Sequence, residues 1–134
     1  MLVKNCPSDQ EIFQKVQKLL AEALGVDEEE VTYTSRIYAD LGAESIDRLD
    51  ITFRAERMWR IKINPGEMTA ESIIDEPDCV KNGLVTDLGM KKMRKKFRHI
   101  KGLDAFETHR KVEELQDLFT VENLCRFVKS KLTK

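Results

Sequence analysis

The chain has 134 residues and a mass of 15.5 kDa, the size of one ordinary domain. A hydrophobic share of 41% suffices for a buried core, while 35% charged residues and no apolar run near ~20 residues exclude a membrane-spanning protein. The net charge of −1 hides an asymmetry. Residues 1–80 hold 9 Lys/Arg against 17 Asp/Glu (−8), whereas residues 81–134 hold 14 against 7 (+7).

The cysteines indicate a reducing compartment. Cys6, Cys79 and Cys125 are odd in number, far apart and without CxxC spacing, which disfavours a disulfide framework. Residues 1–7 lack the apolar stretch of a signal peptide. We therefore expect a cytoplasmic protein whose cysteines are small buried side chains, with Cys125 as the clearest case.

The first predicted helix starts at a cap formed by Ser8 or Asp9 and ends at Gly25. Its apolar residues recur at spacings of three and four: Ile12, Phe13, Val16, Leu19, Leu20, Ala23 and Leu24. A long polar connection then runs to about Gly42, and we expect its spaced apolar residues to pin it to the core: Val26, Val31, Ile37 and Leu41.

A second helix is predicted from about Ser45 to Trp59. Its expected inward stripe is Ile46, Leu49, Phe53 and Trp59, with Ile51 and Met58 on the flanks. The alternating residues 61–63 are too short and isolated to pair as a strand, and a turn follows at Asn64-Pro65-Gly66.

Three further helical segments complete an all-α prediction. Thr86 caps a helix reaching about His99, with a thin apolar side of Leu88, Met93 and Phe97. After Gly102, residues 103–118 form a weaker helical segment. Thr120 caps a final amphipathic helix whose apolar side is Val121, Leu124, Cys125, Val128 and Leu132.

The most informative motif is Asp40-Leu41-Gly42-Ala43-Glu44-Ser45-Ile46-Asp47. A glycine-containing turn brings Ser45 to the start of a helix, where free N–H groups and the helix dipole favour a phosphoester. Glu44 and Asp47 would repel that phosphate locally but would suit a basic partner enzyme. The helix signal alone favours an ordinary N-cap role for Ser45.

This stretch resembles the acyl carrier protein family, in which the prosthetic-group serine lies in Asp-Ser-Leu after a Leu-Gly turn. The order of the elements also follows that family over residues 8–66 and 118–132, with residues 67–117 as a helical insertion. The resemblance implies an acyl-carrier-protein-like helical bundle, with residues 1–134 forming a single carrier domain. The departures are Glu44 in place of Asp and Ile46 in place of Leu.

The resemblance further implies that Ser45 carries 4′-phosphopantetheine, transferred from coenzyme A by a phosphopantetheinyl transferase. Glu44 would be its acidic neighbour, and Ile46, Leu49 and Phe53 would line the acyl chain and core. The chain would then be a monomeric carrier and not an enzyme. Its partners would be acyl-loading and acyl-transfer or condensing enzymes of a specialised bacterial lipid, fatty-acid or secondary-metabolite pathway.

The charges of the second helix differ from the strongly acidic surface of typical carriers. Residues 44–60 hold four acidic residues and four arginines. The candidates for partner docking on this helix are Glu44, Asp47, Arg48, Asp50, Arg54 and Glu56.

The basic run over residues 91–98 allows several interpretations. It can be a solvated helix face, or it can cover the acidic half of the chain. It can also be a docking surface, in which Lys91, Lys92 and Lys95 contact an acidic enzyme, an anionic lipid or a phosphate-bearing substrate. An unmodified interaction module acting through this run is the alternative function. Nucleic-acid binding is not expected, because Phe97 is the run's only aromatic residue and no recognised nucleic-acid motif is present.

Metal binding and hydrolysis are also not expected. His109 and Glu113 share a helical spacing, but His99 is the only other histidine and no cysteines cluster. Ser45 lacks the flanking glycines of a nucleophile elbow, and both histidines belong to the remote insertion.

Overall fold

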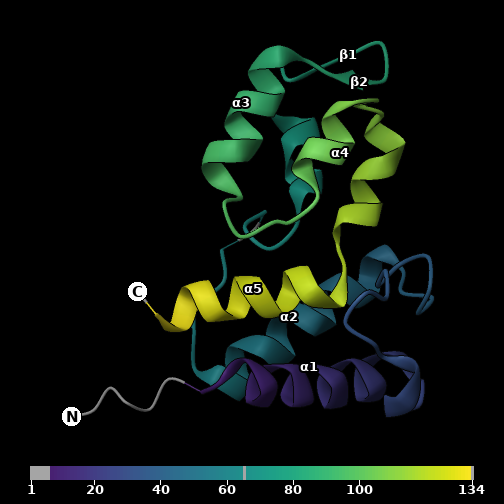
Figure 1. The fold of residues 1–134 in the computed structure, drawn as a ribbon, viewed down its shortest axis with the longest axis vertical. Coiled ribbons are helices and arrows are strands. Elements are labelled where there is room, and N and C mark those ends of the chain that lie inside the picture. Colours follow the sequence, from purple (N-terminus) through teal and green to yellow (C-terminus); the bar gives the residue numbers. More distant parts are fainter. Residues whose placement is uncertain (1–6, 65, 134) are drawn as a thin grey trace.

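The computed structural model describes residues 7–64 and 66–133 in two tiers (Figure 1). The lower tier is a bundle of α1 (Asp9–Leu24), α2 (Ser45–Trp59) and α5 (Val121–Leu132). The upper tier lies between α2 and α5 in sequence and comprises the 3₁₀ helix η3 (Ala70–Asp75), strands β1 (Val80–Lys81) and β2 (Leu84–Val85), α3 (Asp87–Lys96), α4 (Leu103–Glu107) and the 3₁₀ helix η4 (Val112–Leu118). Apart from that short hairpin, the described elements are helical, and the all-α class is confirmed. No helix within the described ranges is long and apolar enough to cross a bilayer.

The bundle helices begin and end where their capping residues predict. The Ser8 hydroxyl accepts from the Glu11 N–H while the Glu11 carboxylate accepts from the Ser8 N–H, and Gly25 ends α1 in the left-handed conformation. The Thr120 hydroxyl accepts from the Asn123 N–H at the start of α5. Local chemistry thus fixes the lengths of both helices.

The connection between α1 and α2 is ordered by its apolar anchors, as predicted. Val31, Ile37 and Leu41 are buried in the bundle core, and a 3₁₀ turn, η2 (Glu28–Glu30), precedes them. The Ile37 N–H donates to the Phe119 carbonyl at 2.9 Å, which ties the loop to the start of α5. The segment leading to α2 is therefore held in place before the helix begins.

The prediction of which α2 side chains face the core is wrong for three of the four residues. Ile46, Leu49 and Phe53 are 74%, 60% and 51% exposed. The buried residues are Ile51, Ala55 and Trp59, of which only Trp59 was expected on the inward stripe. At ~100° per residue, Ile46 and Ile51 lie about 140° apart around the helix, so the two stripes have the same periodicity and different directions.

The upper tier has a hydrophobic core of its own. Its buried residues are Ala70, Ile73, Cys79, Val85, Met90, Met93, Phe97, Ile100, Leu103, Phe106, Leu115 and Leu118. On α3, Met90 takes the inward place expected of Leu88, which is exposed. The helix ends at Lys96 rather than near His99, because the chain leaves helical geometry at Phe97 to bury that ring.

The cysteines behave as predicted within the described residues. Cys79 is buried in the upper core and Cys125 in the bundle core, and both are free thiols. Burial raises the pKa of the Cys125 thiol to about 12, so it stays protonated and apolar. Cys6 lies outside the described residues.

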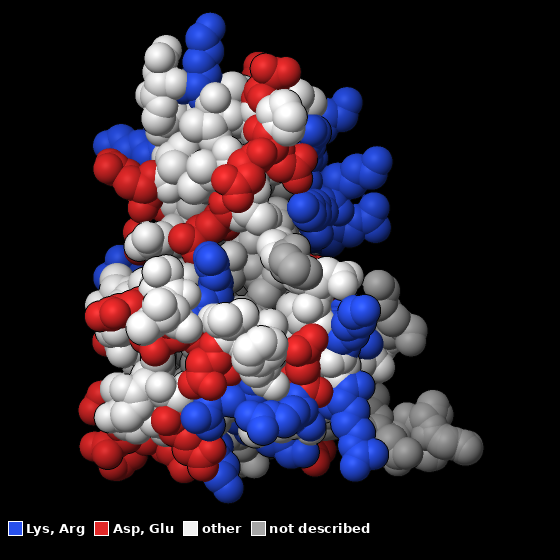
Figure 2. All heavy atoms as spheres, turned by 180° about the vertical axis from the view of Figure 1, so that it is seen from behind, with Lys and Arg blue, Asp and Glu red and all other residues white. Residues whose placement is uncertain are grey.

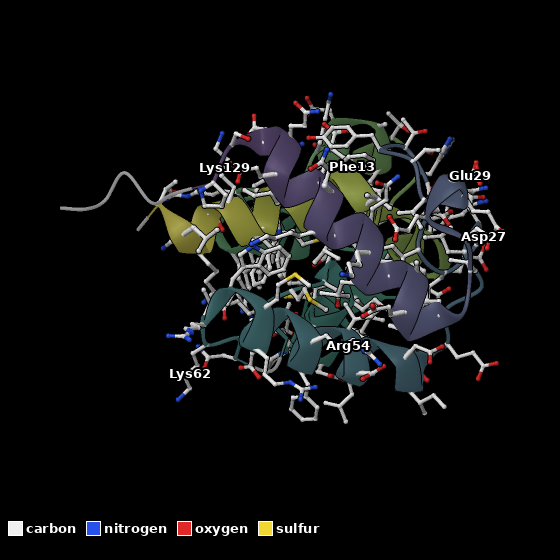
Figure 3. The ribbon with its side chains drawn as sticks, turned by 90° about the horizontal axis from the view of Figure 1, so that it is seen from below. Phe13, Asp27, Glu29, Arg54, Lys62 and Lys129 are labelled. Atoms are coloured by element: carbon white, nitrogen blue, oxygen red, sulfur yellow. The ribbon has the colours of Figure 1, made fainter. Side chains whose placement is uncertain are left out.

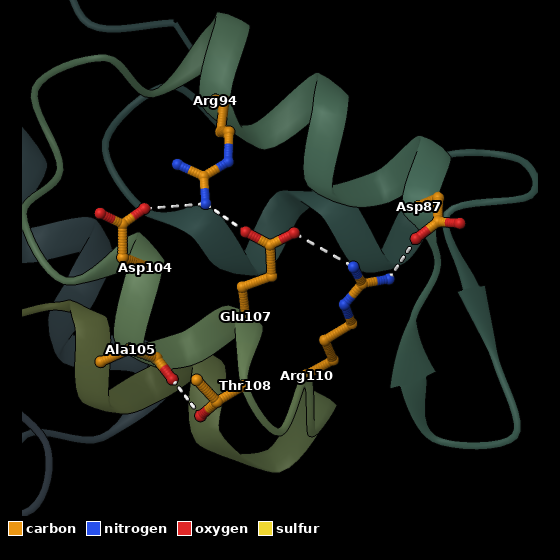
Figure 4. Close-up of polar contacts among 7 residues, drawn as sticks. All are labelled: Asp87, Arg94, Asp104, Ala105, Glu107, Thr108 and Arg110. Carbon is orange, nitrogen blue, oxygen red and sulfur yellow. Dashed lines mark hydrogen bonds and ion pairs between the residues drawn. The ribbon is translucent and has the colours of Figure 1, made fainter.

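A chain of alternating charges braces the upper tier (Figure 4). Arg94 of α3 pairs with Asp104 at 3.0 Å and with Glu107 of α4. Glu107 also pairs with Arg110, whose other partner is Asp87 at the start of α3. These contacts link α3 to α4, and both helices also contribute to the upper core through Met93 and Phe106.

The upper tier is joined to α5 by polar contacts around one buried amide. The Asn123 side chain accepts from the Lys101 N–H at 2.8 Å and donates to the carbonyls of Lys101 and Leu118. The Arg126 guanidinium donates to the His99 carbonyl, and the His99 ring packs against Phe127 with centroids 5.1 Å apart. Residues 99–101 therefore seat the insertion on α5.

We predict that His99 makes stability depend on pH. Burial, followed by the charge of Arg126, lowers the pKa of His99 from 6.5 to about 4, although Glu67 and a backbone hydrogen bond to Met68 oppose this. The unfolded chain therefore binds a proton more readily, and the stabilisation present above pH 6.5 is lost as the pH falls toward 4. His99→Phe should reduce the loss of unfolding free energy between pH 7 and 4 by up to about 3 kcal/mol, measured by urea denaturation. His109→Gln removes the other histidine of the chain, which is exposed, and is the matched control.

We also predict that Gly89→Ala destabilises the upper tier. A methyl group at Gly89 would collide with the Cys79 carbonyl oxygen and lie 2.7 Å from Cγ1 of Val85, so α3 and the hairpin would have to separate. Overpacking of this kind should lower the free energy of unfolding by about 2 kcal/mol. Lys91→Ala, on the exposed side of the same helix, should change it by less than about 0.5 kcal/mol. Equal stability of Gly89→Ala and the wild type would contradict this packing.

Candidate functional site

The start of α2 presents a serine hydroxyl that forms no local contact. The chain turns at Gly42, whose φ of 77° is left-handed, and Ala43 anchors it by donating its N–H to the Ile37 carbonyl. The N-cap of α2 is Glu44, whose N–H donates to Asp47 Oδ2 at 2.8 Å. Ser45 is therefore the first helical residue and not the cap. It is exposed, and its hydroxyl has no hydrogen-bond partner within the part of the chain that the structure describes.

Ser45 lies at the edge of a groove of about 1020 Å³ between α2 and the segment that follows it. The α2 wall consists of Ser45, Ile46, Arg48, Leu49, Thr52, Phe53 and Glu56. The opposite wall is drawn from residues 63–64 and 66–75, among them Met68, Glu71, Ser72 and Ile74. The three exposed apolar side chains of α2 therefore face a cavity large enough for a small-molecule chain.

The opposite wall is positioned by the upper tier. In η3, Ala70 and Ile73 are buried in the upper core, while Ser72 and Ile74 line the groove. Thr52 of α2 donates to the Arg48 carbonyl and contacts the Met68 sulfur at 3.9 Å. The groove thus exists because the insertion folds against α2.

Arg48 spans the groove from α2 to η3. Its Nη1 donates to Glu71 Oε1 at 3.0 Å, and the Tyr38 hydroxyl donates to the same oxygen at 3.0 Å. Burial, and then the charge of Glu71, raises the pKa of Tyr38 to about 12, so the phenol remains a donor. Two segments, the loop before α2 and α2 itself, thus donate to one carboxylate of η3.

The expected docking residues do not share one surface. Arg48 and Glu56 line the groove, and Glu44 and Asp47 lie at its Ser45 end. Arg54 instead pairs with Asp50 at 3.0 Å and with Glu22 of α1 at 3.7 Å, on the side of α2 that adjoins α1 (Figure 3).

The lysines Lys91, Lys92 and Lys95 belong to α3 and are not among the groove residues. Basic side chains gather where α3 forms the edge of the upper tier (Figure 2). Lys92 and Lys96 pair with Glu76, and these contacts lower the pKa of that carboxyl. Within the described residues, α3 thus reaches Glu76 of the acidic half, and no ion pair joins α3 to α2.

The groove wall formed by η3 and the residues before it was not predicted from the sequence. A 3₁₀ turn has no long periodic pattern, and nothing local indicates that residues 68–74 lie opposite α2. The one usable signal was the adjacent pair Ile73 and Ile74, because neighbouring apolar residues in a turn face different directions. One of them is fully buried and the other faces the groove.

No group of His, Cys, Asp and Glu side chains in residues 7–64 and 66–133 is arranged to hold a metal ion. His99 and His109 are both in the upper tier, and neither lines the groove beside Ser45.

Comparisons with known proteins agree with this geometry. Residues 14–75 match the family model described as "Phosphopantetheine attachment site", a range that includes Ser45 and ends at Asp75 of the groove wall. The "Acyl carrier protein" of Thermotoga maritima is 35% identical over 69 residues, covering 52% of this chain and 85% of the relative. The "Acyl carrier protein" of Guillardia theta is 41% identical over 56 residues, covering 42% of this chain and 69% of the relative.

The relatives are carriers and not enzymes, and the prosthetic group of the matched domain is 4′-phosphopantetheine. An exposed serine hydroxyl beside an apolar groove fits a covalently attached arm of that kind. The chain belongs to the acyl carrier protein family.

Proposed function

We propose that Ser45 is the attachment point of 4′-phosphopantetheine. The observation that supports this most directly is its exposed hydroxyl, free of hydrogen bonds to the described residues, at the first position of α2 and inside the matched segment 14–75. A transferase needs access to such a hydroxyl, and a serine engaged in capping would not offer it. Glu44 provides the cap instead and leaves Ser45 available.

The groove is proposed to shelter the arm and its acyl cargo. When bound, 4′-phosphopantetheine supplies a terminal thiol that holds an acyl group as a thioester. Ile46, Leu49 and Phe53 offer apolar surface along α2, and Met68 and Ile74 face them from the other wall. Burial of an alkyl chain against these side chains is favourable by about 0.8 kcal/mol per CH₂.

The proposed role is to present an acyl thioester to enzymes of a specialised lipid, fatty-acid or secondary-metabolite pathway in a bacterial cytoplasm, as a monomer. As a carrier, the chain interacts with a phosphopantetheinyl transferase and with acyl-handling enzymes. We propose that these partners contact Glu44, Asp47, Asp50 and Glu56 together with Arg48 and Arg54. This mixed surface would select partners other than those that recognise a uniformly acidic helix.

The proposed domain organisation is a carrier core of residues 8–66 and 118–132 interrupted by an insertion at 67–117. Two separate buried clusters support it, one drawn mainly from the bundle helices and one from residues 70–118. The Thermotoga relative matches only 69 residues, about half of this chain, which also favours an added segment.

We predict that incubation with coenzyme A and a broad-specificity phosphopantetheinyl transferase adds the mass of one arm to the wild-type chain. Ser45→Ala should abolish the addition, because it removes the only proposed nucleophile, and intact-mass spectrometry reports both results. Ser72→Ala is a matched control, since Ser72 lines the same groove and should leave modification unchanged. A wild-type chain that stays unmodified with several transferases would refute the attachment, as would a modified Ser45→Ala variant.

A second function is favoured by one feature of α3. Lys91 and Lys95 form a short basic stripe one turn apart on α3, and no ion pair engages them within the described residues. Such a stripe is suited to an anionic partner, either an acidic protein or an anionic lipid surface. The alternative is an unmodified interaction module that acts through residues 91–98.

We predict that any binding to anionic phospholipid vesicles at low salt depends on this stripe. Lys91→Glu/Lys95→Glu should reduce the fraction of protein that co-sediments with the vesicles at least tenfold, because it reverses two exposed positive charges. Lys15→Glu/Lys18→Glu makes the same change in net charge on exposed positions of α1 and should bind as the wild type does. Equal losses in both double variants would show that net charge, and not α3, controls binding.

A further inference from the structure

The groove beside Ser45 holds a single counter-charge for an anion. Arg48 is the only cationic side chain among the described residues lining the groove, which also contains Glu56, Glu71 and Asp75. Ser45 and Arg48 are three residues apart on α2, so their side chains lie on the same side of the helix, with Cβ atoms about 5–6 Å apart. A group attached to the Ser45 oxygen would therefore lie within reach of the Arg48 guanidinium.

The carboxylates beside Ser45 oppose a phosphodiester at that position. Glu44 and Asp47 flank the serine, and both carboxylates belong to the first turn of α2. A phosphodiester attached between them adds a negative charge to a negative region. Arg48 is the side chain that can offset this repulsion, since a guanidinium binds phosphate oxygens through paired N–H donors.

Arg48 is also free to change partner at little cost. Its contact with Glu71 Oε1 is half exposed on the arginine side, with 39% of that side chain accessible. If Arg48 leaves, Glu71 keeps the hydrogen bond from the Tyr38 hydroxyl at 3.0 Å. The carboxylate would thus not be left buried without a donor, which is the main penalty for breaking such a pair.

We propose that Arg48 binds the phosphodiester of an arm attached at Ser45, exchanging Glu71 for the phosphate and directing the arm along the groove between α2 and η3. The proposal rests on the attachment at Ser45 proposed above. Arg48 then acts as a positioning residue for the arm, and Glu71 is its competitor. The exchange also removes one of the contacts that link η3 to α2, so attachment of the arm weakens the η3 wall at that point.

The experiment compares the apo and arm-loaded forms of the full chain by NMR, with loading verified by intact mass. In the wild type, the ¹⁵N and ¹H shifts of the Arg48 Nε–H group should change on loading, and those of Arg54 should not. Arg54 is the matched control because it also lies on α2 and also pairs with carboxylates, one of them Glu22 on another helix, but it does not line the groove.

The phosphorus resonance of the loaded chain provides a second readout. Arg48→Gln should shift and narrow the ³¹P signal relative to the wild type, Arg48→Lys should restore part of the difference, and Arg54→Gln should leave the signal unchanged. Glu71→Gln should move the signal in the direction opposite to Arg48→Gln, because it removes the competing carboxylate.

The outcomes separate the two proposals. If the wild type loads but its Arg48 Nε–H resonance and the ³¹P signal of Arg48→Gln are unaltered, Arg48 does not bind the phosphate and the attachment site stands. If the wild type cannot be loaded, the attachment at Ser45 fails and this inference fails with it. The wild-type apo and loaded spectra decide the question even where a variant does not fold or load.

Discussion

The rotation of α2 about its own axis is the constraint on which the site depends. Ile51 and Ala55 are fully buried against α1 and α5, and Trp59 closes the same core. Burial of these side chains stabilises the bundle by several kcal/mol in total and leaves one rotation available to the helix. That rotation directs Ile46, Leu49 and Phe53 outward into the groove and sets Ser45 and Arg48 at its edge. The exposed apolar stripe therefore follows from how the bundle packs.

The insertion completes the site while keeping a separate core. Ala70 and Ile73 belong to the upper core, yet the other side of the same 3₁₀ turn forms the groove wall. Asn123 and residues 99–101 seat the upper tier on α5, and Met68 joins the bundle core beneath the groove. A change in the packing of the upper core would therefore move the groove wall opposite α2. Through that wall, the insertion can affect how the proposed acyl chain is bound.

The structure shows which of the charges behind the sequence asymmetry form ion pairs within the protein. Much of the positive charge of the upper tier is used internally, as Lys92 and Lys96 pair with Glu76 and Arg94 pairs across to α4. On α3, Lys91 and Lys95 form no such ion pair within the described residues. On α2 the arginines are likewise divided, since Arg54 pairs with Asp50 and Glu22 whereas Arg48 faces the groove. Part of the charge of each tier is thus matched by opposite charges in the same tier.

The sequence by itself determined the helices of the bundle, because caps such as Ser8 and Thr120 and the stop at Gly25 act through contacts within a few residues. It also singled out Ser45, through the family resemblance of the motif at residues 40–47 and of the order of elements around it. It could not choose between the two apolar stripes of α2, which share one period and differ only in direction. Nor could it bring Glu71 to Arg48 and Tyr38, since that meeting joins residues 23 and 33 positions apart. The tertiary structure decided both, because only packing of α2 against α1 and α5, and of η3 against the upper core, specifies which surfaces face each other.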